Sequence, residues 1–118
     1  MPKHILIADD NPTVRQVIKK RLFKTVDVEQ CREAANGREA IELAAKSKPD
    51  LVILDVSMPD MDGVTAAKLL KESLPGTPII LFTMYKLDDS AAKLGVDAVV
   101  SKLSLGKLTD EVLALLFR

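Results

Sequence analysis

The stretch Asp50–Gly63 reads DLVILDVSMPDMDG, and it decides the fold. Its first part, Leu51–Leu54, is an unbroken apolar run, which is typical of a strand buried on both faces. Asp55 follows that strand directly, a loop leads to Gly63, and a helix is expected from about Gly63 to Glu72. A buried strand followed by a loop and a helix is one unit of a parallel α/β sheet.

The same unit recurs along the chain. The predicted strands are Ile5–Ala8, Val26–Glu33, Leu51–Leu54, Ile79–Phe82 and Ala98–Val100. The first helix is expected after the cap Asn11-Pro12, with Val14, Val17, Ile18 and Leu22 recurring on its apolar face. Further helices are expected after the turn Asn36-Gly37, near Gly63, over Asp88–Leu94 and after the cap Ser104. The second strand is polar and is expected at the sheet edge. Five such units predict a parallel sheet covered by helices on both faces.

The composition is that of an ordinary globular chain. The 118 residues are 47% apolar and 29% charged, which fits one domain over residues 1–118. Lys+Arg and Asp+Glu are both 17, and this balance argues against direct nucleic-acid binding and against electrostatic attachment to a membrane. The apolar run near the N-terminus is too short for a signal peptide or a spanning helix. A single Cys excludes an intrachain disulfide and fits a reducing compartment.

The ends of the predicted strands carry the chemistry. Asp9 and Asp10 follow the first strand, Asp55 the third, Thr83 the fourth, and Lys102 lies near the end of the fifth. A parallel sheet brings these residues to one edge. Carboxylates placed close together repel one another, so they either protonate in part or bind a cation, and an all-oxygen ligand set suits Mg²⁺. Asp55 can then accept a phosphoryl group as a nucleophile while the metal and Lys102 neutralise charge.

Four stretches of the chain resemble one known family, the receiver domain of bacterial two-component response regulators. They are ILIADDNPTVR (5–15), ANGREAIELAAKSKPDLVILDVSMPDMDGV (35–64), PIILFT (78–83) and AVVSK (98–102). The resemblance covers nearly the whole chain. It implies a flavodoxin-like, doubly wound (βα)5 three-layer sandwich whose five parallel strands are ordered 2-1-3-4-5.

The resemblance also implies a role for each strand-end residue. Asp55 would be phosphorylated by a histidine kinase or a phosphotransfer protein. Asp10 and Asp55 would bind Mg²⁺ directly, Asp9 mostly through water, and the backbone carbonyl of Ser57 would complete the protein ligands. The Thr83 hydroxyl would move toward the phosphoryl group, and Lys102 would be its counter-ion.

The implied protein is a cytoplasmic phosphoacceptor with self-catalysed transfer and hydrolysis, rather than a turnover enzyme. Phosphorylation would shift the domain between two conformations, and an effector domain or a downstream protein would respond to the change. Formation of a homodimer on activation is a further possibility. No output domain is expected within residues 1–118. The stretch ANGREAIELAA resembles regulators whose effector binds DNA.

The chain departs from the family pattern at four places. Met84 replaces a small residue, Val99 the aromatic switch residue and Leu103 a proline. The stretch from Thr83 to Lys102 is also about one helical turn shorter than in typical members. All four changes lie on the signalling side, so phosphorylation is expected to be retained and the output surface to be atypical.

Three other functions fit the sequence less well. A pseudo-receiver, which binds partners without useful phosphorylation, is favoured by Met84 and Val99 but disfavoured by the complete set of acidic residues and Lys102. A phosphatase of the haloacid-dehalogenase type would need a second Asp where Ser57 stands. A flavodoxin would need a Gly-rich, hydroxyl-rich first loop and more than 3% aromatic residues.

Overall fold

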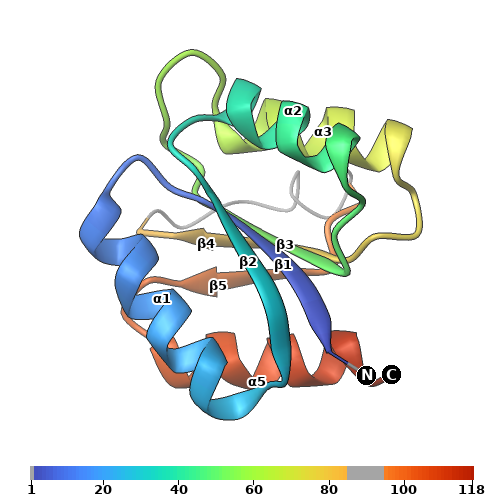
Figure 1. Cartoon of the computed structure of the whole chain (residues 1–118). Helices are drawn as coiled ribbons and strands as arrows, with labels where there is room; N and C mark the ends of the chain where they lie inside the picture. Colours follow the sequence, from blue (N-terminus) through green and yellow to red (C-terminus); the bar gives the residue numbers. More distant parts are fainter. Residues whose placement is uncertain (1, 85–94) are drawn as a thin grey trace.

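The computed structural model describes residues 2–84 and 95–118. It contains a sheet of five parallel strands in the order β2-β1-β3-β4-β5, which confirms the predicted order (Figure 1). The strands are β1 (Lys3–Ala8), β2 (Val28–Ala34), β3 (Leu51–Leu54), β4 (Ile79–Thr83) and β5 (Ala98–Ser101). The polar strand β2 lies at one edge, as its sequence predicts.

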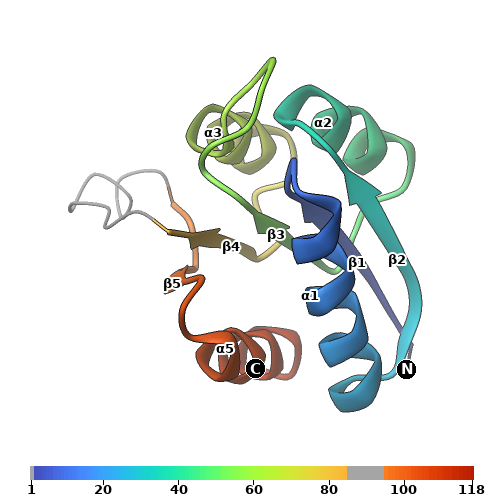
Figure 2. The same ribbon diagram turned by 90° about the vertical axis from the view of Figure 1, so that its left-hand side faces the viewer.

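Helices cover both faces of the sheet. The helices α1 (Pro12–Thr25) and α5 (Leu105–Leu116) lie on one face, and α2 (Gly37–Lys46) and α3 (Gly63–Ser73) lie on the other (Figures 1 and 2). The three-layer sandwich is therefore confirmed. The helix expected over Asp88–Leu94 lies outside the described residues.

Each face of the sheet has its own hydrophobic core because successive side chains of a strand point to opposite faces. In β1, Ile5 and Ile7 pack on the side of α1 and α5, whereas Leu6 and Ala8 pack on the side of α2 and α3. β3 alternates in the same way, and all four of its residues are buried. An apolar run rather than an alternating one is what a central strand with two covered faces requires.

Polar residues fix where three of the helices begin. Asn11 caps α1 through Oδ1, which accepts from the backbone of Thr13 at 2.9 Å, and Pro12 follows at the first helical position. Asp62 caps α3 in the same way. The predicted turn at Asn36-Gly37 is in fact the start of α2, because the Asn36 side chain accepts from the Glu39 N–H at 2.8 Å.

Three other sequence expectations also need correction. β2 begins at Val28 instead of Val26, because the Val26 N–H donates to the Leu22 carbonyl and ends α1. Val17 is 46% exposed, because Ile18 and Leu22 form the buried stripe of α1 and Val17 lies at its side. Ser104 stands at the N-cap of α5, but its side chain makes no capping hydrogen bond.

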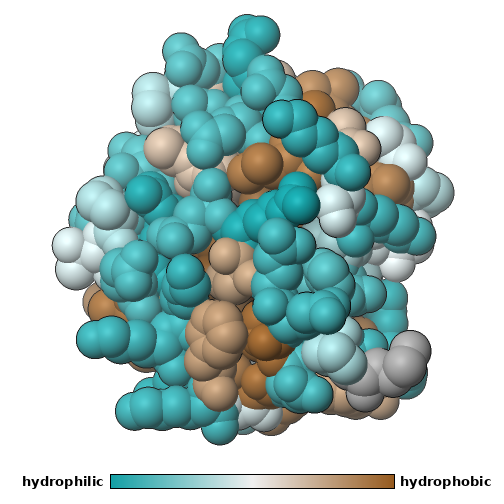
Figure 3. Space-filling view, viewed as in Figure 1, coloured by the Kyte–Doolittle hydropathy of each residue, from teal (hydrophilic) through white to brown (hydrophobic). Residues whose placement is uncertain are grey.

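The face seen in Figure 3 is mostly hydrophilic, with apolar side chains showing between hydrophilic ones. Within residues 2–84 and 95–118, no helix is both long and apolar enough to cross a membrane.

Candidate functional site

The carboxyl ends of the strands meet at one edge of the sheet, and the backbone ladder continues past them. The Asp9 N–H donates to the Ala34 carbonyl at 3.0 Å, and the Asp55 N–H donates to the Ala8 carbonyl at 2.8 Å. These bonds fix the first residue after β1 and after β3. The predicted strand-end residues Asp9, Asp10, Asp55 and Lys102 therefore come together, although up to 93 positions of sequence separate them.

Three carboxylates form what we call the acidic cluster, Asp9, Asp10 and Asp55. Each offers an oxygen, and these oxygens lie within 4.8 Å of one another. Asp9 and Asp55 are buried, whereas Asp10 is exposed to solvent. A set of carboxylate oxygens with one open side matches the needs of Mg²⁺, which takes oxygen ligands and keeps several waters. The residues present thus fit this metal.

Lys102 closes the buried side of the acidic cluster. Its Nζ lies 2.7 Å from Asp9 Oδ2 and 3.2 Å from Asp55 Oδ2. Burial disfavours the charged amine, but the hydrogen bond and charge of Asp9, together with Asp55, outweigh it and hold the pKa of Lys102 above its ordinary 10.5. Lys102 therefore stays charged, and it is bound more closely to Asp9 than to Asp55.

The surroundings of Asp55 disfavour its ionised form. Burial and the neighbouring charge of Asp9 raise the pKa of Asp55 above its ordinary 3.8, and Lys102 only partly offsets this. Its Oδ1 accepts a long hydrogen bond, 3.4 Å, from the Ser57 N–H, and its Oδ2 faces Lys102. A carboxylate whose charge is incompletely compensated is suited to receive a cation or an electrophile.

The loop between β3 and α3 is fixed by close backbone contacts. The Gly63 N–H donates to the Val56 carbonyl at 2.8 Å, and a Cβ at Gly63 would lie 1.8 Å from the Asp55 carbonyl oxygen. The Gly37 N–H donates to the Met61 carbonyl at 3.0 Å, and a Cβ there would lie 2.4 Å from the same oxygen. Both glycines are needed because two backbone segments approach too closely for a side chain.

Thr83 and Ser57 frame the cluster. Thr83 ends β4, is buried, and its carbonyl accepts from the Lys102 N–H at 2.9 Å. Ser57 is exposed two residues after Asp55. The structure thus joins Thr83 to Lys102 through the backbone, and the exposed Ser57 to Asp55 through its N–H.

The atypical residues are on the surface. Met84 directly follows β4 and is 58% exposed, and Val99 in β5 is 44% exposed. Leu103 is 81% exposed. The part of the Thr83–Lys102 stretch that covers residues 85–94 lies outside the described residues.

Sequence reasoning missed two residues that support the acidic cluster. Arg15 on α1 donates from Nη1 to the Asp9 carbonyl, and its Nε donates to Glu33 on β2 at 3.0 Å. The contact of Arg15 could have been predicted from the helix cap at Asn11 and Pro12, because this cap places the first turn of α1 beside the end of β1. Glu33 carried no comparable signal, because only the register of β2 against β1 brings it near.

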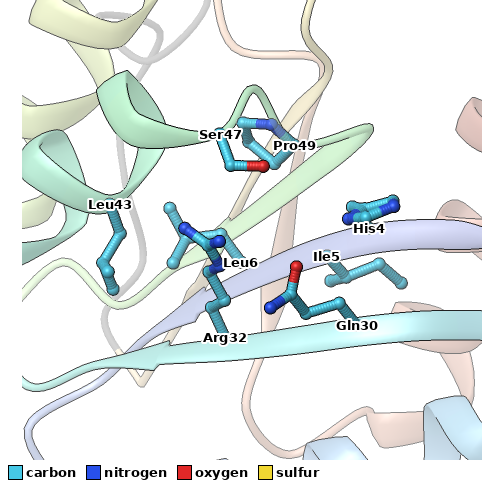
Figure 4. A pocket seen from close by; sticks show the side chains of 8 residues that line it. All are labelled: His4, Ile5, Leu6, Gln30, Arg32, Leu43, Ser47 and Pro49. Atoms are coloured by element: carbon cyan, nitrogen blue, oxygen red, sulfur yellow. The ribbon is translucent and has the colours of Figure 1, made fainter.

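The carboxylates of the acidic cluster line none of three concavities in the described part of the chain. Figure 4 shows one between β1, β2 and the end of α2, lined by His4, Ile5, Leu6, Gln30, Arg32, Leu43, Ser47 and Pro49. Its volume of about 10 Å³ suffices for a single water. A second, about 160 Å³ and mainly apolar, lies between α1, Phe82 and Leu105, with Lys102 in its lining. Both are smaller than the usual cofactor site. A third, about 460 Å³, lies between β5 and α5, and its lining includes Val99, Ser104, Lys107 and Asp110.

Comparison with known proteins agrees with this geometry. Residues 5–112 match the family described as the response regulator receiver domain. The response regulator protein VraR of Staphylococcus saprophyticus is 37% identical over 105 residues, covering 86% of this chain and 50% of that protein. A protein-glutamate methylesterase/protein-glutamine glutaminase of Archaeoglobus fulgidus is 39% identical over 102 residues, covering 86% of this chain and 27% of that protein. The chain thus spans half or less of these two relatives.

Solved structures show the same fold. The Thermotoga maritima response regulator TrrA, solved in complex with Mg²⁺-BeF, is 31% identical and superposes with a TM-score of 0.86, covering 96% of this chain and 98% of that one. A LuxR-family response regulator from Aurantimonas reaches a TM-score of 0.90 at 25% identity, covering 98% of this chain and 86% of that one. With the family match spanning nearly all of its length, the chain belongs to the response regulator receiver domain family.

Proposed function

We propose that this chain is a phosphoacceptor of a two-component system, and that Asp55 accepts a phosphoryl group from a histidine kinase or a phosphotransfer protein. The observation that carries the proposal is the position of Lys102, whose Nζ bridges Asp9 and Asp55 at 2.7 and 3.2 Å beside a third carboxylate, Asp10. A cation held against a cluster of acidic oxygens at strand ends is the arrangement that phosphoryl transfer needs.

The transfer step forms one bond and breaks one. A carboxylate oxygen of Asp55 bonds to phosphorus while the bond from phosphorus to the donor atom breaks, and the donor leaves with the electron pair and takes up a proton. Burial and Asp9 raise the pKa of Asp55, whereas Lys102 favours the ionised, nucleophilic form of this carboxylate. Lys102 then neutralises charge on the transferred group from the buried side.

Mg²⁺, when bound, would neutralise charge on the phosphoryl oxygens. We assign Asp10 and Asp55 as direct ligands, Asp9 as a ligand mostly through water, and the Ser57 backbone carbonyl as the remaining protein ligand. The exposure of Asp10 and Ser57 supports this assignment, because a phosphodonor and water must reach the metal from solvent. The Thr83 hydroxyl is the proposed donor to a phosphoryl oxygen after transfer.

The relatives support the same function at a coarser level. TrrA was solved with Mg²⁺-BeF. The relatives named as methylesterases are far longer than this chain, so we propose that residues 1–118 form a receiver domain without methylesterase activity. Signal output would pass to an effector domain or a separate protein, and activation can proceed through a homodimer.

The test is intact-mass spectrometry after incubation with acetyl phosphate and Mg²⁺. Wild type is expected to gain one phosphoryl mass, and Asp55→Asn and a sample treated with chelator to gain none. Asp60→Asn is the matched control, because Asp60 lies in the same loop with a positive φ of 64° that Asn tolerates, and it is expected to behave as wild type. Wild type that binds Mg²⁺ but gains no mass, even with a histidine kinase as donor, would contradict the proposal and favour the pseudo-receiver.

A further inference from the structure

Arg15 is tied to the backbone of the acidic cluster rather than to its carboxylates. Its Nη1 donates to the Asp9 carbonyl, and its Nε donates to Glu33 Oε1 at 3.0 Å. The side chain is only 16% exposed. A planar guanidinium that donates to two acceptors on different elements holds both in one fixed geometry, which a single ammonium cannot do.

The Asp9 residue is held at every polar atom. Its N–H donates to Ala34, its Oδ1 accepts from the Asn11 N–H at 2.9 Å, its Oδ2 accepts from Lys102, and its carbonyl accepts from Arg15. In contrast, no hydrogen bond or ion pair within the described residues holds the Asp10 carboxylate. The position of Asp10 therefore depends on the backbone that carries it.

The Asp9 carbonyl and the Asp10 N–H belong to one planar peptide unit. A donor that fixes the Asp9 carbonyl therefore also fixes the direction in which the chain enters Asp10. We propose that Arg15, anchored by Glu33, is a positioning residue that presents the Asp10 carboxylate to the metal. This inference rests on the proposed function, because it takes Asp10 as a ligand of Mg²⁺.

Lys19 provides the natural comparison. It lies one turn further along α1, and its Nζ is 3.6 Å from Glu33 Oε2, so it shares the acidic partner of Arg15. Among the contacts of the described residues, Lys19 has none with Asp9. Simple charge arguments predict that loss of either cation strengthens Mg²⁺ binding, because a positive charge near the site is removed. The positioning role predicts the opposite sign for Arg15 alone.

The experiment is a titration of the ¹⁵N-labelled chain with MgCl2, followed by the amide shifts of Asp10 and its neighbours. Arg15→Met is expected to weaken Mg²⁺ binding roughly tenfold, the usual effect of losing a group that orients a metal ligand. Lys19→Met is expected to bind as tightly as wild type or slightly tighter. Arg15→Lys is expected to lie between wild type and Arg15→Met. Arg15→Met binding at the wild-type affinity or above would overturn the inference.

The experiment also distinguishes failure of the proposed metal site from failure of a variant to fold. If wild type itself shows no Mg²⁺-dependent shifts, the metal site in the proposed function is wrong and the positioning role fails with it. If thermal unfolding shows that Arg15→Met does not fold, the Mg²⁺ affinity of a folded Arg15→Lys variant tests the inference instead. Weaker binding than wild type supports the positioning role, and equal binding overturns it.

Discussion

Gly63→Ala tests whether the close approach of the loop to Asp55 holds the site together. The new Cβ would lie 1.8 Å from the Asp55 carbonyl oxygen and 2.7 Å from its carbonyl carbon. A carbon atom normally stays about 3.3 Å or more from a carbonyl oxygen, so the two segments must separate by roughly 1.5 Å. Both colliding partners are backbone, which leaves no flexible side chain to give way.

The expected cost is at the upper end for an overpacked position, about 3 kcal/mol. For a chain of this size that corresponds to a fall in Tm of roughly 12 °C. The shift also strains the hydrogen bond from the Gly63 N–H to the Val56 carbonyl, 2.8 Å, which closes the loop behind Asp55. Mg²⁺ binding should therefore weaken along with stability.

Thermal unfolding followed by circular dichroism measures this effect. Gly76→Ala is the matched control, because a Cβ at Gly76 would meet nothing within 4 Å. It should change stability by about 1 kcal/mol or less, in the stabilising direction. A Gly63→Ala Tm within about 2 °C of the Gly76→Ala value would refute the packing argument.

Three further predictions concern charged groups. Burial and Asp9 raise the pKa of Asp55, so the ionised Asp55 destabilises the fold above pH 3.8, increasingly as pH rises through the folded pKa. Asp55→Asn should thus melt at a higher temperature than wild type at pH 7, and the difference should shrink toward pH 3.8; equal melting temperatures at pH 7 would contradict this. Lys102→Met removes a cation from the acidic cluster and should tighten Mg²⁺ binding about tenfold or more, as measured by titration; weaker binding would show that Lys102 organises the site instead. Burial opposes ionisation of Asp97, but the hydrogen bonds from Lys71 and a backbone N–H outweigh it and lower its pKa. Asp97→Asn should therefore cost roughly 1.5–3 kcal/mol at pH 7 in urea unfolding. The cost should shrink as pH falls from 3.8, where the carboxylate of the unfolded chain becomes protonated, through the lower pKa of the folded protein; a cost that does not depend on pH would contradict the ionic origin.

The sheet was predictable because its signals are local. Leu51–Leu54 and Ile79–Phe82 are continuous apolar runs, and only strands covered on both faces need that pattern. The cap at Asn11-Pro12 likewise predicts where α1 begins. In contrast, the dipeptide Asn36-Gly37 is equally typical of a turn. Only the hydrogen bond that the Asn36 side chain accepts from the Glu39 N–H identifies it as the start of a helix.

The three carboxylates of the site could be predicted from the sequence, but the residues that hold them, Arg15 and Glu33, could not. Asp9, Asp10 and Asp55 follow strands directly, so topology alone brings them together. Arg15 and Glu33 are charged residues on a helix and an edge strand, where charge is ordinary on a surface. Their contact with each other depends on the register between β1 and β2, which no local pattern in the sequence encodes.

The central claim is that Asp55, and no other residue, carries the phosphoryl group. The most direct measurement is to incubate the chain with acetyl phosphate and Mg²⁺, trap any acyl phosphate by reduction with sodium borohydride, and sequence the peptides by mass spectrometry. Homoserine is expected at position 55, with Asp9 and Asp10 unchanged. Homoserine at Asp9 or Asp10, or at none of the three in a chain shown to have gained phosphoryl mass, would contradict it.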